Sequence, residues 1–280
     1  MRPKVGLGSF AYRYAIGIKN FWPEEPMDAI GFMEAAYRLG YDGVQLCENL
    51  CYAELRDEEL EAIAREAKRM GLFVELGLSG LTDKNLARHL EIASITGAPM
   101  IRVVVGENEA SEAVKTIRTA LPQLRKKNII LGLENHFDLS IDELVHVVEE
   151  IDEAHVGLIF DTTNGLGFLE KPEDSIAKAQ PYLVSLHIKD YIIRKVEAGY
   201  FITGTVLGEG ALDVPAILQA ALAAPGLRSI TLEMTIKRDE GKGFREIVEW
   251  EEMAIRKSSA NLQEILGKLA ASEAKENFDD

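Results

Sequence analysis

Residues 129–161 decide the fold, and they read IILGLENHFDLSIDELVHVVEEIDEAHVGLIFD. A continuous apolar run over 129–134 predicts a buried strand, and a second run over 156–161 predicts another. Between them, residues 140–151 have the apolar spacing of an amphipathic helix. Ser140, followed three positions later by Glu143, matches a capping box and marks the start of that helix. The stretch is therefore a strand–helix–strand unit, whose strands we expect to be parallel neighbours in one sheet.

The same alternation continues in both directions along the chain. We expect further strands at 5–10, 43–47, 72–76, 100–105, 183–187 and 229–233, and helices at 27–39, 57–70, 84–96, 110–127, 173–180, 214–223 and about 244–269. Eight strands alternating with eight helices over 280 residues predict an α/β fold, a single (β/α)₈ TIM barrel over 1–280 with a polar tail at 272–280.

An open, doubly wound sheet is the alternative arrangement of these elements. Its first strand normally leads into a phosphate-binding loop with three glycines. The corresponding stretch here, Gly6 to Tyr12, has only two glycines and does not lead directly into a helix. The barrel is therefore the better interpretation.

Composition excludes several classes of partner. The 31 basic and 46 acidic residues give a net charge of −15, which disfavours nucleic acid and anionic membranes, because both require cationic surfaces. No apolar run reaches the roughly 18 residues of a membrane span. The two cysteines, Cys47 and Cys51, match neither a disulfide framework nor a zinc motif. An apolar strand follows the N-terminus almost at once, so we expect a cytoplasmic protein without a targeting segment.

Four successive strands end on a residue that can bind a metal. Active sites in this barrel lie at the carboxyl ends of the strands, and there the sequence places Glu134, Asp161, His187 and Glu233. Three neighbouring carboxylates are costly to bury unless a cation compensates them. This oxygen-rich set predicts one divalent metal ion, with Mn²⁺ expected and Mg²⁺, Co²⁺ or Zn²⁺ as alternatives.

At this point the sequence resembles a known family, the xylose isomerase-like TIM barrels, also called the sugar phosphate isomerase/epimerase group. The resemblance covers roughly residues 3 to 255. It rests on five motifs: Leu133-Glu134-Asn135-His136, Phe160-Asp161-Thr162-Thr163-Asn164, Leu186-His187-Ile188-Lys189-Asp190, Gly208-Glu209-Gly210 and Leu232-Glu233.

The resemblance implies both a chemistry and a set of roles. The Glu-Asp-His-Glu set of that family holds one metal, and its two glutamates, here Glu134 and Glu233, exchange protons with the substrate. The implied function is an isomerase or epimerase of a small sugar, keto-sugar or sugar phosphate, acting through a metal-stabilised enediolate. Members commonly form dimers or tetramers, so the resemblance also implies a homodimer or homotetramer.

Two departures open an alternative. The sugar epimerases carry a histidine where Asn164 stands, and the segment from Asp190 to Gly210 is longer than their seventh loop. That segment is more similar to members that act on oxidised sugar acids, such as 3-oxo-isoapionate decarboxylases. A lyase that decarboxylates or dehydrates a keto-sugar acid is therefore the alternative, with Lys189 and Arg194 as candidates to bind an acidic group. We expect the long segment from Tyr191 to Gly208 to act as a lid.

Further residues are candidates for substrate binding. Tyr12 belongs to a first-loop cluster with Phe10, Arg13, Tyr14 and Trp22 that could wall the pocket with aromatic faces. Glu48, Glu75, Asn135 and His136 follow other strand ends and could bind hydroxyl groups or orient the ligands. His136 and Asn164 are candidates for substrate binding.

An endonuclease IV-like DNA repair enzyme is an alternative from a different class. That enzyme needs three zinc ions and additional histidines at strand ends. The sequence has only 5 histidines and a net charge of −15, so composition disfavours it.

Overall fold

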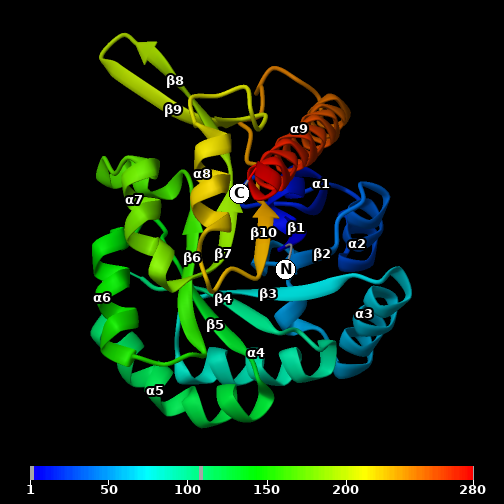
Figure 1. The fold of residues 1–280 in the computed structure, drawn as a ribbon. Helices are drawn as coiled ribbons and strands as arrows, with labels where there is room; N and C mark the ends of the chain where they lie inside the picture. Colours follow the sequence, from blue (N-terminus) through cyan, green and yellow to red (C-terminus); the bar gives the residue numbers. More distant parts are fainter. Residues whose placement is uncertain (1–2, 107–109, 280) are drawn as a thin grey trace.

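The computed structural model describes residues 3–106 and 110–279, and its centre is a closed barrel of eight parallel strands (Figure 1). The predicted fold class is therefore confirmed. Around the barrel the order is β1-β10-β7-β6-β5-β4-β3-β2. The strands are β1 (Lys4–Gly8), β2 (Gly43–Leu46), β3 (Phe73–Ser79), β4 (Met100–Val104), β5 (Ile130–Glu134), β6 (Val156–Asp161), β7 (Leu183–Ile188) and β10 (Ser229–Leu232).

Helices surround the strands and cover their outer faces (Figure 1). They are α2 (Ala29–Arg38), α3 (Asp57–Met70), α4 (Asp83–Thr96), α5 (Ala110–Lys127), α6 (Ile141–Ile151), α7 (Pro172–Ala179), α8 (Val214–Leu222) and α9 (Phe244–Asp279), with a short α1 (Arg13–Ile16) after the first strand. The predicted capping box at Ser140 and Glu143 is present and begins α6. Gly71 and Gly97 end α3 and α4 in the left-handed conformation that glycine adopts without strain.

The segment predicted to be a long lid loop is instead an antiparallel hairpin. β8 (Asp190–Val196) pairs with β9 (Gly199–Thr205), and the hairpin projects from the barrel at the upper left of Figure 1. Aromatic and β-branched side chains on both arms favour this extended pairing over an irregular loop. The base of the hairpin is held closely, because a Cβ at Gly204 would overlap the backbone of Thr235.

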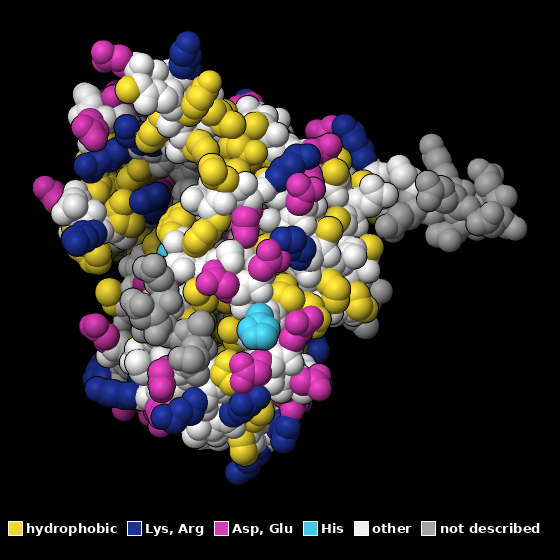
Figure 2. Space-filling view, turned by 90° about the vertical axis from the view of Figure 1, so that its left-hand side faces the viewer, with side chains coloured by type: hydrophobic (Ala, Val, Ile, Leu, Met, Phe, Trp, Pro, Cys, Tyr) yellow, Lys and Arg dark blue, Asp and Glu magenta, His cyan; other side chains and the backbone are white. Residues whose placement is uncertain are grey.

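The outer part of this hairpin is apolar and exposed. Figure 2 shows hydrophobic side chains gathered near the top of the molecule, where the hairpin lies. The exposed ones on the hairpin are Ile193, Val196, Tyr200, Phe201 and Ile202.

The last helix is longer than predicted. It was expected to end near Leu269 and to leave a polar tail over 272–280, but α9 continues to Asp279. Residues 270–279 contain no glycine or proline, so no residue in them stops the helix. Asp280 lies outside the described residues. Among the described helices, none is both long and apolar enough to cross a membrane.

Candidate metal centre

The four predicted ligands meet at the carboxyl end of the barrel. Glu134 and Asp161 are the last residues of β5 and β6, His187 is the last but one of β7, and Glu233 follows β10 directly. Parallel strands in register bring these ends to one rim, and Asp161 pairs with His187 across β6 and β7. All four side chains are buried, and one ligand atom from each lies within 4.8 Å of the others.

The donor set fits a divalent ion. One oxygen of Asp161, Oδ1, accepts hydrogen bonds from the backbone N–H groups of Thr163 (2.9 Å) and Asn164 (3.0 Å). The other oxygen, Oδ2, is buried without a hydrogen-bond partner, and so is Oε2 of Glu233. Buried carboxylate oxygens are rarely left in this state, and a bound cation would satisfy both.

The cluster already contains positive charge from its own chain. Nδ1 of His187 lies 3.3 Å from both Glu134 Oε1 and Glu233 Oε2. Nζ of Lys189 lies 2.7 Å from Asp161 Oδ2 and 3.0 Å from Glu233 Oε2. The contact of His187 with Glu134 is a hydrogen bond, and the two oxygens without a hydrogen bond, Asp161 Oδ2 and Glu233 Oε2, have Lys189 as an ion-pair partner.

Arg102 supplies a third cation. It stands in the middle of β4, is buried, and donates from Nε to Glu134 Oε2. Three carboxylates thus face three groups that can carry positive charge, Arg102, His187 and Lys189. The protein's own side chains therefore offset the negative charge of the three carboxylates. A metal ion must replace some of these ion-pair contacts in order to bind.

Electrostatics follow from this geometry. Burial opposes protonation of His187, but the carboxylates of Glu134 and Glu233 outweigh it and raise the pKa of His187 to about 10. Burial also acts to raise the pKa of Glu134, yet the neighbouring Arg102 and His187 lower that pKa to about 2. Glu134 is therefore held as a charged ligand.

A buried polar chain stands behind His187. Its Nε2 lies 3.0 Å from the side-chain amide Nε2 of Gln45, which donates to Glu75 Oε2 at 3.2 Å. Glu75 Oε1 in turn accepts from the Ser229 hydroxyl at 2.8 Å. A contact to the second ring nitrogen fixes the orientation of a histidine ring. Gln45 and Glu75 are therefore positioning residues for His187.

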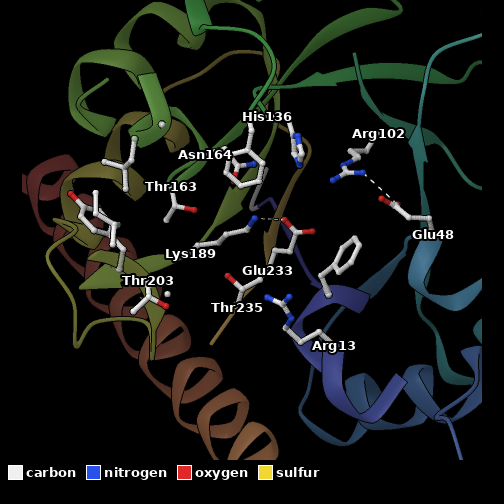
Figure 3. Close-up of a pocket in the computed structure, with 17 residues that line it drawn as sticks. Arg13, Glu48, Arg102, His136, Thr163, Asn164, Lys189, Thr203, Glu233 and Thr235 are labelled. Carbon is white, nitrogen blue, oxygen red and sulfur yellow. Dashed lines mark ion pairs between the residues drawn. The ribbon is translucent and has the colours of Figure 1, made fainter. Parts of the chain in front are cut away.

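A cavity of about 460 Å³ opens above the cluster (Figure 3). Glu233 reaches its floor, and the predicted substrate-binding residues His136, Asn164 and Lys189 line its walls. Asn164 also donates to Glu134 Oε1 at 3.4 Å, so it connects the cavity with the metal cluster.

Two predicted substrate-binding residues do not reach this cavity. Tyr12 is buried, and its hydroxyl donates to Glu252 of α9 at 2.5 Å. Arg194 is exposed on β8 and does not line the cavity. Because the segment forms a hairpin, Arg194 lies away from the base, and the hairpin lines the cavity with Tyr191, Ile202, Thr203 and Gly204 instead.

Three further charged residues reach the cavity. Arg13 is expected among the first-loop residues that could wall the pocket, and Glu48 among those that could bind hydroxyl groups or orient ligands, whereas the sequence analysis does not single out Arg102. All three line the cavity. The signal for Arg102 was a charged residue inside the apolar run Met100–Val104.

The Gly208-Glu209-Gly210 motif has a structural role. The buried carboxylate of Asp190 accepts from the backbone N–H groups of Gly208 and Gly210, both at 2.9 Å. A Cβ at Gly210 would overlap this carboxylate, so the contact requires glycine there. Asp190 thereby fixes the segment after β9 to the start of β8.

Comparison with known proteins agrees with this arrangement. The family model described as xylose isomerase-like TIM barrel matches residues 33–253. A 3-oxo-isoapionate decarboxylase from Pectobacterium atrosepticum is 29% identical over 223 residues, which cover 77% of this chain and 79% of that protein.

Two solved structures share the fold. A D-psicose 3-epimerase crystallised with D-fructose superposes with a TM-score of 0.71 at 17% identity, covering 94% of this chain and 99% of that one. A xylose isomerase-like TIM barrel protein from Mycobacterium smegmatis, in complex with magnesium, gives a TM-score of 0.66 at 18% identity, covering 92% of this chain and 98% of that one.

Proposed function

Because the chain belongs to the xylose isomerase-like TIM barrel family, we propose that it is a divalent-metal-dependent isomerase or epimerase of a small sugar, keto-sugar or sugar phosphate. One observation carries the proposal. Ligand atoms of four buried residues converge, one of the four, Glu233, lines the cavity, and two carboxylate oxygens of the cluster lack a hydrogen-bond partner among the described residues. The sugar substrate of the similar epimerase supports the substrate class.

Glu134, Asp161, His187 and Glu233 would hold the metal. A divalent ion bound there supplies a Lewis acid that draws electron density from carbonyl and hydroxyl oxygens. We expect Mn²⁺, since three of the four ligands are carboxylates, with Mg²⁺, Co²⁺ or Zn²⁺ as alternatives.

The two glutamates differ in their freedom to exchange protons. Both oxygens of Glu134 are engaged, Oε2 by Arg102 and Oε1 by Asn164 and His187. Glu233 lines the cavity and keeps Oε2 without a hydrogen bond. Glu233 is therefore the better-placed base to take a proton from the carbon beside the substrate carbonyl, which forms the enediolate. Lys189, within 3.0 Å of Glu233, is placed to hold the resulting negative charge.

Because only Glu233 is free to exchange a proton, decarboxylation of a keto-sugar acid is a second candidate reaction. In that reaction the bond between the carboxylate carbon and its neighbour breaks, CO₂ leaves, and the electron pair moves into the ketone to form an enolate. A single acid then returns a proton to the carbon, so a second free glutamate is not needed. The similar decarboxylase from P. atrosepticum supports this candidate.

Reconstitution followed by a substrate screen tests both candidates. Metal-free protein is reloaded with Mn²⁺ and incubated in D₂O with ketoses, keto-acids and their phosphates. An isomerase or epimerase incorporates deuterium at the carbon beside the carbonyl, while a decarboxylase releases CO₂. Glu233→Gln should abolish either reaction and Glu134→Gln should retain more activity. Full activity in Glu233→Gln would contradict the assignment of the base.

A further inference from the structure

Three cationic side chains, Arg13, Arg102 and Lys189, line the cavity of a chain whose net charge is −15. Two of them have carboxylate partners. Arg102 pairs with Glu134 and lies 3.7 Å from Glu48, and Lys189 pairs with the metal cluster. For Arg13, no carboxylate lies within ion-pair distance in the described part of the chain.

Arg13 points into the cavity from a fixed support. In Figure 3 its guanidinium extends from α1 toward Thr235, on the other side of Glu233 from His136. Helix α1 is held in place because the backbone N–H groups of Tyr14 and Ala15 donate to Glu251 of α9 at 2.8 Å and 3.0 Å. The Nε atom of Arg13 is buried, yet it has no hydrogen-bond partner. A guanidinium that lines the cavity and has no carboxylate partner among the described residues can pair with an anionic group of a ligand.

We infer that Arg13 binds a carboxylate of the substrate, which makes the substrate class sugar acids. The inference rests on the proposed function of the same cavity. A guanidinium offers a planar pair of N–H donors that matches the two oxygens of a carboxylate. On the far wall Nη1 of the buried Arg102 has no hydrogen bond, although Glu48 Oε2 lies 3.7 Å from it.

A phosphate fits the cavity less well. Phosphate sites in this barrel commonly use the segments after the seventh and eighth strands, with backbone N–H groups as donors. In this chain the N–H groups of Gly208 and Gly210, after the seventh barrel strand, are taken by Asp190. A single guanidinium with neighbouring threonine hydroxyls then remains, and this suits a carboxylate.

Arg13 has one other possible role, which the test must separate. Its charge acts on the buried carboxylate of Glu251, so it could serve only to stabilise α9 against α1. In that case, removing it would lower stability without changing ligand preference, and the loss would disappear in a Glu251→Gln background.

Three ligands with the same four-carbon chain serve as probes: D-erythronate, erythritol and erythritol 4-phosphate. Their binding is measured by calorimetry on metal-free and Mn²⁺-loaded protein, for wild type, Arg13→Met and Arg13→Lys. Arg194→Met is the matched control, because it removes an arginine that does not line the cavity. Wild type and the control should bind erythronate about 10- to 100-fold more tightly than the other two, as expected for hydrogen bonds to a charged group. Arg13→Met should lose this preference, and Arg13→Lys should recover part of it.

Several outcomes would overturn the inference. Equal or undetectable binding of erythronate and erythritol by wild type would do so, as would an unchanged preference in Arg13→Met. Tighter binding of the phosphate would show that the carboxylate is the wrong group. If wild type fails to bind Mn²⁺, the proposed function fails, but titration of the metal-free protein still tests Arg13. Thermal melting of each variant, alone and with Glu251→Gln, identifies a purely structural effect.

Discussion

Replacing Lys189 should strengthen metal binding, although Lys189 lies in the centre of the site. Its ammonium is 2.7 Å from Asp161 Oδ2 and 3.0 Å from Glu233 Oε2, the two oxygens that lack hydrogen bonds. A divalent ion needs the same oxygens, so the ammonium and the metal compete. We therefore expect Lys189→Met to remove a competitor while it destabilises the metal-free protein.

The magnitude follows from a thermodynamic cycle. Removing one partner of a buried ion pair costs about 3–5 kcal/mol, and this cost applies to the metal-free protein. In the Mn²⁺-loaded protein the metal offsets the charge of the carboxylates. Lys189→Met should therefore lower the free energy of unfolding by only about 1 kcal/mol, as for an exposed ion pair. The difference of about 2–4 kcal/mol corresponds to a roughly 30- to 1000-fold gain in Mn²⁺ affinity.

Two measurements check this cycle. Calorimetric titration gives the Mn²⁺ affinity, and urea unfolding with and without Mn²⁺ gives the two stabilities. Lys195→Met is the control, since Lys195 is exposed on the hairpin and should change neither quantity. A folded Lys189→Met protein whose Mn²⁺ affinity equals or falls below that of wild type would refute the competition.

Three further predictions concern the rest of the chain. Asp161→Ala and His187→Ala should each weaken Mn²⁺ binding by at least about 10-fold in the same titration, because each removes a ligand. Gln45→Leu should weaken Mn²⁺ binding by roughly 10- to 100-fold, because it removes the contact that orients His187. Wild-type Mn²⁺ affinity in this variant would show that Gln45 does not orient His187 for metal binding. Burial raises the pKa of Glu251 to about 8, above an unfolded value of about 4.3, so the folded state binds the extra proton. The free energy of unfolding should therefore fall by up to about 1.4 kcal/mol per pH unit as pH rises from about 5 to 8. Glu251→Gln should flatten this slope in urea unfolding, and parallel slopes would contradict the assignment.

The barrel and the cluster of four candidate ligands could be predicted because both depend on a local pattern. Short apolar runs that alternate with amphipathic helices leave few folds to choose from. In a parallel barrel all strands end at one rim, so a polar residue after each run is placed without further information. Glu134, Asp161, His187 and Glu233 were found in this way.

The walls of the cavity could not be predicted as well, because they depend on contacts between distant segments. Arg102 faces the barrel interior, but a strand that is buried on both faces has no alternation to reveal its inward side. Tyr12 and Arg13 are adjacent in sequence, and only the packing of α9 against α1 decides which of them reaches the cavity. Arg194 is expected there because it belongs to the segment from Tyr191 to Gly208, but its place in the hairpin puts it outside the cavity lining. The runs of aromatic and β-branched residues over Tyr191 to Ile193 and Tyr200 to Thr203, on either side of Gly199, were the available signal for a hairpin.

Diffraction from Mn²⁺-loaded crystals at the manganese absorption edge locates the metal ion. We expect one anomalous peak per chain, about 2 Å from an oxygen of Glu134, Asp161 and Glu233 and from Nδ1 of His187. We also expect Lys189 to have moved away from Asp161 Oδ2. A peak elsewhere, or no peak while Lys189 still contacts both carboxylates, would contradict the assignment of these four residues as a metal site.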